Sequence, residues 1–279
     1  MLKNYIATKD ILAYSRIVNR LRSFFLNRGC IEAHTQDRLS ILAACEDPTT
    51  LATFAYGGIA WPLPQTGQMW LEYELLKNPE LPGVFCVSTS YRQEQNPVPG
   101  RHELIFPMFE FEIPGTMDDL RILETALCEY VGFGNGRDFA YTTYEAAARF
   151  YGAGELTGEH EMRMRNDFGE VVFIERFPSH TSPFWNMRRE GDHACKIDVV
   201  LYGMETIGSA ERSVNRNEMR REFYTISNGT YAETLHNTFG RERVKEELEG
   251  FLSFDFFPRY GGGIGITRLI RALKLKQLL

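Results

Sequence analysis

Charged and aromatic side chains flank a loop in the segment YRQEQNPVPGRHELIFPMFEFE. They are Arg92 and Glu94 before the loop, and Arg101, His102 and Phe106 after it. An arginine pairs with two phosphate oxygens at once, and an aromatic ring stacks on a purine base. The segment is therefore a candidate nucleotide-binding hairpin. The alternative is a solvated hairpin whose arginines form surface ion pairs.

Two carboxylates, Asp198 and Glu205, lie seven residues apart in a strand-like segment. On a continuous strand, an odd separation directs two side chains to opposite faces. A β-bulge permitted by Gly203 would bring both carboxylates to one side, where their oxygens could hold Mg²⁺. The alternative is an ordinary strand with an exposed acid at either end.

A run of glycines, GGGIGITR, ends at Arg268 near the C-terminus. It is not a P-loop, because no lysine follows its last glycine, and it is not a GxGxxG dinucleotide-binding turn. Glycines let the backbone approach a ligand closely, and Arg268 could reach an anion from the helix that follows. Taken alone, the run does not identify a ligand.

Hydrophobic periodicity predicts the elements that position these residues. Apolar residues recur every three or four positions between residues 8 and 28, and Gly29 follows as a typical C-cap, which indicates an amphipathic helix. Strands are expected at 84–91, 105–113, 171–174 and 197–202, a helix at about 116–130, helix-compatible sequence at 217–249, and a glycine turn, short strand and helix at 261–273. This order, without βαβ regularity, predicts an α+β fold with an antiparallel sheet flanked by helices.

A segment rich in glycine and small residues, 132–158, is expected to be a small insertion or a mobile flap. The rest of the chain shows no repeat and no linker, so we expect one domain over residues 1–279. The five cysteines lie far apart and form no C-x-x-C pair. This spacing predicts buried, reduced thiols rather than disulfides or a zinc site.

Length and charge exclude several classes of protein. The chain has 279 residues, 31 Lys and Arg against 37 Asp and Glu, and a formal net charge of −6 at pH 7. A chain this long buries roughly three-quarters of its unfolded surface, so its core requires no disulfide or metal. The acidic balance argues against broad electrostatic binding of nucleic acid. No apolar run approaches the about 20 residues of a membrane span, and the N-terminus is unlike a signal peptide, so we expect a cytoplasmic protein without membrane contact.

Taken together and in order, the three segments resemble the motifs of class II aminoacyl-tRNA synthetases, in particular the aspartyl and asparaginyl subgroup. The second motif of that family is an Arg-x-Glu strand, a loop, a basic residue and a Phe, and its third motif is a glycine-rich strand ending in Arg. The matching residues are Arg92, Glu94, Arg101, His102 and Phe106 for the second motif, and Gly263, Gly265 and Arg268 for the third. An Asp and a Glu seven apart, followed by Gly-Ser-x-x-Arg, are similar to Asp198, Glu205 and Arg212.

The resemblance implies that an amino acid carboxylate attacks the α-phosphorus of ATP, giving an aminoacyl-adenylate and pyrophosphate. It implies ATP and Mg²⁺ as cofactors. The implied ATP contacts are Arg92 at the α-phosphate, Phe106 at adenine, Arg268 with Arg101 or His102 at the γ-phosphate, and Glu94, Glu205, Gly263 and Gly265 around them. Asp198 and Glu205 would hold the metal. Glu46 and Gln68 would meet the backbone of the amino acid, and Arg212 its side chain.

The chain departs from the family pattern at several positions. Gln36 lies near the place of a proline at the family's dimer interface, although a homodimer remains the expectation. Thr267 replaces an acidic residue before the third-motif arginine. Leu71 replaces a lysine that the aspartyl enzymes place three residues after the pocket glutamine, so recognition of aspartate lacks one cation. The first-motif helix starts near residue 8, so we expect no anticodon-binding domain and no reading of an anticodon in any contact with tRNA.

Three acceptors of the activated acyl group are compatible with this resemblance. A stand-alone ligase similar to archaeal asparagine synthetases would transfer the group to ammonia or a small amine. A truncated synthetase paralog would transfer it to tRNA or to a protein lysine. A catalytically silent paralog would serve as a binding or regulatory subunit.

Overall fold

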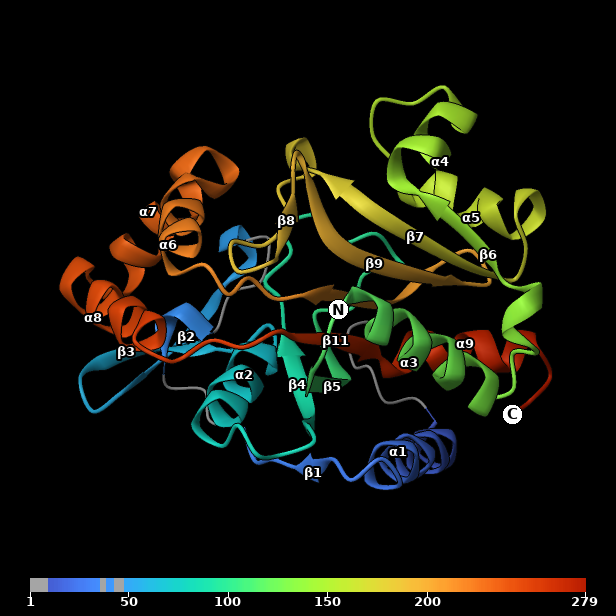
Figure 1. Ribbon diagram of the computed structural model, residues 1–279, viewed down its shortest axis with the longest axis horizontal. Coiled ribbons are helices and arrows are strands. Elements are labelled where there is room, and N and C mark those ends of the chain that lie inside the picture. The colour runs from blue at the N-terminus through green and yellow to red at the C-terminus, as the bar shows by residue number, and fades with distance from the viewer. Residues whose placement is uncertain (1–9, 36–38, 43–47) are drawn as a thin grey trace.

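The computed structural model describes residues 10–35, 39–42 and 48–279. Within them, a nine-stranded sheet has the order β1-β4-β5-β11-β10-β9-β7-β6, and β8 pairs with β9 off this path (Figure 1). The strands are β1 (Ile31–Glu32), β4 (Val84–Tyr91), β5 (Ile105–Pro114), β6 (Ala140–Thr143), β7 (Val171–Pro178), β8 (Arg189–Glu190), β9 (His193–Leu201), β10 (Glu205–Glu211) and β11 (Arg259–Gly265). The pairs β1–β4 and β6–β7 are parallel, and the other neighbours are antiparallel.

Helices cover both faces of this sheet (Figure 1). One face carries α1 (Ile11–Leu26), α3 (Met117–Tyr130) and α9 (Ile266–Leu275). The other face carries α2 (Gln68–Lys77), α6 (Arg216–Thr225), α7 (Thr230–Phe239) and α8 (Arg241–Leu252) at one end, and α4 (Tyr144–Tyr151) and α5 (Gly158–Asp167) at the other. A separate hairpin consists of β2 (Ala52–Tyr56) and β3 (Ile59–Leu63). The α+β prediction, an antiparallel sheet flanked by helices, is confirmed.

The N-terminal helix shows how local sequence sets an element boundary. It begins at Ile11 because the Asp10 carboxylate accepts a hydrogen bond from the Ala13 amide at 3.0 Å, which caps the first turn. Its apolar face, including Phe24 and Phe25, is buried against the sheet. The predicted helix is therefore α1, with its ends two or three residues inside the predicted range.

Side-chain alternation along the central strands separates a core face from a polar face. On β5, Phe109 and Phe111 belong to the core that α1 covers, whereas Met108 and Glu110 line a cavity on the opposite face. On β11, Ile264 faces the same core. The strand residues that could do chemistry therefore project from the side of the sheet opposite to α1, α3 and α9.

Two glycine-rich segments form regular elements of the fold. Segment 132–158 contributes β6, which pairs with β7, and α4, which packs on the same sheet, and its status as a small insertion stays a prediction. The glycines at 261–265 lie within β11 rather than in a turn. A Cβ on Gly261 would lie 1.7 Å from Glu112 Oε2, and one on Gly262 would lie 2.6 Å from the Cβ of Ser209. Close approach of neighbouring side chains therefore requires glycine here.

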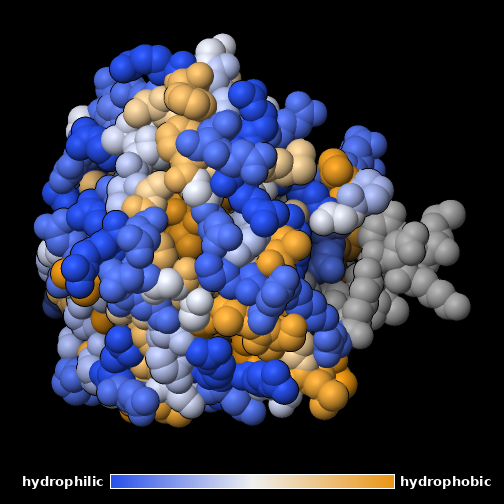
Figure 2. Space-filling view, turned by 90° about the vertical axis from the view of Figure 1, so that its right-hand side faces the viewer, coloured by the Kyte–Doolittle hydropathy of each residue, from blue (hydrophilic) through white to orange (hydrophobic). Residues whose placement is uncertain are grey.

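Figure 2 looks onto the side of the molecule that lies at the right of Figure 1, where most side chains are hydrophilic and apolar ones gather in the lower part. On α1, Ile11 and Leu12 are 71% and 78% exposed. Within the described residues, no helix is long and apolar enough to span a bilayer. Buried thiols outside any disulfide are found as predicted at Cys30, Cys86, Cys128 and Cys195, while Cys45 lies outside the described residues.

Candidate active site

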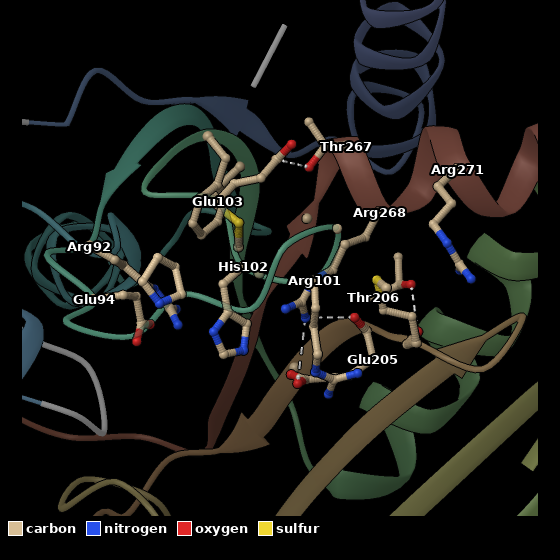
Figure 3. A pocket seen from close by; sticks show the side chains of 18 of the residues that line it. Arg92, Glu94, Arg101, His102, Glu103, Glu205, Thr206, Thr267, Arg268 and Arg271 are labelled. Carbon is tan, nitrogen blue, oxygen red and sulfur yellow. Dashed lines mark hydrogen bonds and ion pairs between the residues drawn. The ribbon is translucent and has the colours of Figure 1, made fainter. Parts of the chain in front are cut away.

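A cavity of about 530 Å³ opens on the polar face of the sheet, between the β4–β5 loop, the start of β10 and the N-terminal end of α9 (Figure 3). Residues predicted for nucleotide binding come from three distant segments and line it together. They are Arg92, Glu94, Arg101, His102, Phe106, Glu205, Gly263, Gly265 and Arg268. The geometry therefore favours one joint site over a set of unrelated surface ion pairs.

The β4–β5 hairpin carries an arginine and an aromatic ring on one wall. The Arg92 amide donates to the Leu104 carbonyl at 2.8 Å, which closes the hairpin around the loop. The Arg92 guanidinium carbon lies 5.6 Å from the centroid of the Phe106 ring, a cation–π distance. The His102 Nδ1 accepts a hydrogen bond from the Val98 amide at 3.4 Å, which turns the loop back toward the cavity.

Arg101 forms an ion pair with a residue of α5, a helix about 60 positions later in the chain that no sequence motif assigns to the site. Its Nη2 lies 2.7 Å from Glu161 Oε1 on α5, and the other oxygen of Glu161 accepts a hydrogen bond from the Glu205 amide at 2.9 Å. A Cβ on Gly158 would lie 2.5 Å from Arg101 Cζ, so this glycine leaves room for the guanidinium. One carboxylate therefore ties the β4–β5 loop to the start of β10.

Arg268 projects from the first turn of α9 toward the same strand. Its Nη1 donates to the Glu205 carbonyl at 2.8 Å and lies 3.7 Å from the Glu205 carboxylate. Thr267, just before it, donates its hydroxyl to Glu103 Oε2 at 2.7 Å. This bond joins the start of α9 to the end of the β4–β5 loop, so the predicted second and third motifs are in direct contact.

Asp198 and Glu205 reach the same side of the sheet through a hairpin, whereas the sequence suggested a bulge at Gly203. Tyr202 and Gly203, with φ of +52° and +75°, form the two-residue turn that joins β9 to β10. The irregularity in this strand pair lies between Glu205 and Ile207 instead. The two acids therefore come from neighbouring strands, not from opposite ends of one strand.

The two carboxylates converge above Gly208. A Cβ on this glycine would lie 3.1 Å from Glu205 Oε1 and 3.5 Å from Asp198 Oδ1. Lys196 lies beside them, with Nζ 3.2 Å from Asp198 Oδ2. Mg²⁺ is bound through one or two carboxylates together with substrate phosphates, so this pair fits the ion. Among the described residues, no group of three or more His, Cys, Asp or Glu forms a protein-only metal site.

A second cavity, of about 140 Å³, adjoins the first on the same sheet face. Arg92, Glu205 and Gly263 line both cavities. A Cβ on Gly263 would lie 2.9 Å from Gln68 Nε2, so glycine lets the side chain of Gln68 cross the strand. Gln68 Oε1 accepts a hydrogen bond from Arg212 Nη2 at 2.9 Å. Two of the residues predicted to contact the amino acid are thus directly bonded.

Two glutamates and two arginines form a buried network beside this second cavity. Arg212 Nη2 lies 3.0 Å from Glu112 Oε2, and Arg259 Nη2 lies 2.5 Å from Glu72 Oε2. Arg212 also approaches Glu72, with 3.5 Å between Nε and Oε1. None of the four is more than 3% exposed. Burial raises the pKa of Glu112, and the charge of Arg212 opposes this shift.

Asn186 is attached to this network. Its Nδ2 donates to Glu72 Oε1 at 2.6 Å, and because a carboxylate only accepts, this bond fixes which way the amide points. The Asn186 oxygen is buried without a hydrogen-bond partner. Both Glu72 and Asn186 line the second cavity, so an amide and a carboxylate face it beside the Arg212 guanidinium.

A third buried carboxylate, Glu110, shapes the turn before α2. It accepts hydrogen bonds from the Gly67 amide at 2.8 Å, from the Thr66 hydroxyl at 2.5 Å, and from the Ser88 hydroxyl. Burial raises the pKa of Glu110, while the bonds from Ser88 and Thr66 act in the opposite direction. These bonds fix the N-terminal end of α2 and with it the position of Gln68.

Leu71 does not face the second cavity. It packs with Leu75, Val84 and Cys86 in an apolar cluster between α2 and β4. The cavity instead meets Glu72, the next residue of α2. Glu46, predicted to contact the amino group of the substrate, lies outside the described residues, as does Gln36.

The family model described as "tRNA synthetases class II (D, K and N)" matches residues 2–277. The chain belongs to this family. It is 34% identical to a human cytoplasmic asparagine–tRNA ligase and 27% identical to the mouse enzyme, each over 256 aligned residues covering 78% of this chain. An aspartate–tRNA(Asp/Asn) ligase of Methanopyrus kandleri is 23% identical and covers 92% of this chain.

Solved class II synthetases share the fold. An asparaginyl-tRNA synthetase from Pyrococcus horikoshii, complexed with asparaginyl-adenylate, superposes with a TM-score of 0.76 at 18% identity, covering 94% of this chain and 64% of its own. The Entamoeba histolytica asparaginyl-tRNA synthetase, also with asparaginyl-adenylate, has a TM-score of 0.72 at 20% identity, covering 94% and 63%. The chain spans 45% and 46% of the mouse and human enzymes and 62% of the Methanopyrus enzyme.

Several residues of the site were not predicted from the sequence. Glu72 could have been found, because it follows Gln68 by four positions on a predictable helix and so shares its face. Asn186 and Glu161 lie far along the chain from their partners, and no spacing marks them. Arg271 lines the first cavity one turn after Arg268, and only its place on the same helix face points to it.

Proposed function

We propose that this chain activates an amino acid with ATP, forming an aminoacyl-adenylate and releasing pyrophosphate. The observation that carries the proposal is the junction of the two cavities at Arg92 and Gly263, with the paired carboxylates of Asp198 and Glu205 beside it. The larger cavity is rich in arginine and suits a triphosphate, and the smaller one suits an amino acid. Membership of the family supports the same reaction.

The reaction requires no general base, because the attacking carboxylate is already an anion. Its oxygen bonds to the α-phosphorus, the bond from that phosphorus to the bridging oxygen of the β-phosphate breaks, and the electron pair leaves with pyrophosphate. Catalysis then depends on alignment and on neutralising charge in the transition state. Arg92, at the junction, would contact the α-phosphate, and Arg101, His102 and Arg268 the distal phosphates. Phe106 would stack on adenine.

Magnesium fits between the proposed ligands Asp198 and Glu205, where it would neutralise phosphate charge. Glu94 and the glycines Gly263 and Gly265 complete the wall of the nucleotide cavity. These glycines allow close approach of a ligand because they carry no side chain. Their assignment to ATP is part of the proposal.

The second cavity favours an amino acid whose side chain ends in an amide. Arg212 offers donors and Glu72 an acceptor, with their charged atoms 3.5 Å apart. An amide has one carbonyl to accept from Arg212 and one NH₂ to donate to Glu72. A carboxylate side chain would instead face the negative charge of Glu72. We therefore propose asparagine ahead of aspartate, with Gln68, and Glu46 in the undescribed segment, at the backbone of the substrate.

The acyl acceptor distinguishes two versions of this function. Transfer to ammonia or a small amine, as a stand-alone ligase, agrees with the net charge of −6, which gives no general attraction to RNA. Transfer to tRNA, without reading of the anticodon, is favoured by the relatives, which are named as tRNA ligases. Transfer to a protein lysine and a catalytically silent role are further outcomes. A cytoplasmic homodimer is proposed in each case, supported by the exposed Ile11 and Leu12 on α1.

The test is amino-acid-dependent exchange of labelled pyrophosphate into ATP, screened over all amino acids. We expect exchange with asparagine, and at least tenfold less with aspartate. Repeating the reaction with ammonia and with bulk tRNA, while AMP release is followed, identifies the acceptor. Absence of exchange with every amino acid, in protein that binds ATP, would contradict the proposal and favour the silent paralog.

A further inference from the structure

Lys196 lies on β9 beside the two acids proposed to hold Mg²⁺, and no motif of the sequence pointed to it. Residues two apart on a strand share a face, and Lys196 Nζ lies 3.2 Å from Asp198 Oδ2. The other oxygen, Asp198 Oδ1, lies above Gly208, where Glu205 Oε1 also lies. Asp198 therefore faces a protein cation with one oxygen and the second proposed ligand with the other.

The surroundings of Lys196 hold its ammonium group in this place. Its Nζ lies 4.2 Å from the centroid of the Phe177 ring on the neighbouring strand β7, a cation–π distance. The side chains of Lys196 and Asp198 are only 13% and 12% exposed. Water and salt screen such a pair less than a pair at the surface, so the positive charge acts on Asp198 with little screening.

Glu205 also has a cation beside it. Arg268 Nη1 lies 3.7 Å from its carboxylate (Figure 3). Glu161 accepts a hydrogen bond from the Glu205 amide, but its charge is paired with Arg101 at 2.7 Å. Glu124, on the α3 side of the same strands, has its pKa raised to about 8 by burial and is mostly uncharged at pH 7. Within the described residues, each ionised acid around the proposed metal position therefore faces one basic side chain.

The walls of the two cavities add no large excess of acid. Four arginines and three glutamates line the larger cavity. Three basic and three acidic side chains line the smaller one, namely Arg92, Lys196 and Arg212 with Glu72, Glu110 and Glu205. A divalent cation is attracted by net negative charge, and the described residues offer it little before a ligand binds. A triphosphate brings the negative charge that is missing.

We propose that Lys196 is an internal counter-ion that keeps Mg²⁺ from binding to Asp198 and Glu205 until a nucleotide is present. Its ammonium group repels an entering cation, and the phosphates of the nucleotide outweigh this repulsion. Lys196 acts on the metal through Asp198 and is therefore a positioning residue. This inference rests on the proposed function, because it concerns the metal site proposed there.

The experiment measures the binding of Mn²⁺, as a probe for Mg²⁺, to the full chain at pH 7 without nucleotide, by electron paramagnetic resonance. Lys196→Met removes the charge and keeps an unbranched apolar stem, and Lys196→Gln is a second neutral variant. Each should bind Mn²⁺ at least fivefold more tightly than the unchanged protein. Damage to the fold cannot imitate this gain. Adding Asp198→Asn to Lys196→Met should abolish the gain, which assigns it to the acid pair.

Two further variants are controls. Lys196→Arg keeps the positive charge and should bind Mn²⁺ as the unchanged protein does. Lys276→Met removes a lysine that pairs with Glu170 at 2.6 Å and lines neither cavity, so it should also leave Mn²⁺ binding unchanged. In a separate calorimetric titration, the unchanged protein should bind the ATP analogue AMPPCP at least tenfold more tightly with Mg²⁺ than without it.

Four results would overturn the counter-ion role: Mn²⁺ affinity within twofold of the unchanged protein in both neutral variants, an equal gain in Lys276→Met, a gain that survives Asp198→Asn, or AMPPCP binding that is indifferent to Mg²⁺. The proposed function fails independently. If the neutral variants gain Mn²⁺ affinity but no amino acid supports exchange, the counter-ion role stands and activation does not. If exchange occurs and Mn²⁺ binding does not depend on Lys196, activation stands and the counter-ion role does not.

Discussion

The two cavities solve the same electrostatic problem in opposite ways. In the larger one, four arginines and three glutamates line the wall, and this excess of positive charge favours an anionic ligand. In the smaller one, Arg212 and Arg259 are already paired with Glu72 and Glu112 below the surface. The first arrangement stores unsatisfied charge for binding. In the second, the side chains of the protein balance one another's charges before a ligand binds, which also stabilises the fold.

This difference separates effects on activity from effects on stability. Arg268 is about a third exposed, so water and salt screen its charge when no ligand is bound. Arg259 is fully buried, and removing it leaves Glu72 and Glu112 to share the charge of Arg212 in a place that water does not reach. Substitutions in the larger cavity should therefore change binding and rate, and those in the buried network should change the free energy of unfolding.

The largest expected effect on stability comes from Arg259→Ala. The change leaves Glu72 without its 2.5 Å partner, and we expect the free energy of unfolding to fall by about 3–5 kcal/mol. Urea unfolding at pH 7, followed by tryptophan fluorescence, measures it. A loss below about 1 kcal/mol would show that the network is not what holds the second cavity together.

Arg268→Ala tests the other side of the comparison. Loss of one charge-assisted contact to a developing phosphate anion should lower the exchange rate roughly 10²- to 10³-fold, without a change in urea midpoint. Arg216→Ala is a suitable control, because Arg216 forms an exposed ion pair with Asp255 at 2.9 Å and lines neither cavity. Equal rates in the two variants would remove Arg268 from the phosphate site.

The same contrast explains what the sequence could predict. Arg92, Glu94, Arg101, His102 and Phe106 lie within one hairpin, so spacing alone brings them together once the two strands are predicted. The three segments of the larger cavity could also be matched to a family pattern. Most of this cavity was therefore predictable, apart from Arg271 and the α5 contact through Glu161.

The second cavity was harder to predict because its contacts join remote segments. Its buried residues come from four separate elements: Glu72 from α2, Glu112 from β5, Asn186 from the segment before β8, and Arg259 from β11. Their pairing depends on the strand order β5-β11-β10. No local pattern contains that order. The convergence of Asp198 and Glu205 was predicted in part. The sequence allowed both carboxylates to reach one side of the sheet through a bulge at Gly203, whereas the structure brings them together through the hairpin turn at Tyr202 and Gly203.

Glu124 sharpens the comparison, because it is a buried acid without a cation. It lies on α3 and forms no ion pair among the described residues, and the Ser209 hydroxyl is the polar side chain that stabilises its charged form. Burial raises the pKa of Glu124 to about 8, and repulsion by Asp198 and Glu175 adds to this. Since its folded pKa lies above the ordinary value of 4.5, the folded state holds this proton more tightly, and stability is lost as the pH rises from 4.5 through about 8.

Glu124→Gln removes this titration while keeping the shape. We expect the variant to gain roughly 1–3 kcal/mol over the unchanged protein at pH 8.5, and little at pH 5. Urea unfolding of both proteins at several pH values gives the difference, in which the contributions of other titrating groups, including Glu112, cancel. A difference that does not vary with pH would mean that Glu124 is already ionised in the folded state.

The smallest expected effect on activity is at Glu161, which lies beside the larger cavity. Its carboxylate is half-buried and balances Arg101 while accepting from the Glu205 amide. Glu161→Gln keeps an oxygen for that amide but removes the charge, so Arg101 loses its partner and its fixed position. We expect about 1 kcal/mol, seen as a roughly fivefold rise in the KM for ATP with a smaller change in kcat. Glu159→Gln, an exposed position on the same helix, should leave both unchanged. If the two variants have the same KM for ATP, the β4–β5 loop alone positions Arg101. In that case α5 packs against the sheet without contributing to the nucleotide site.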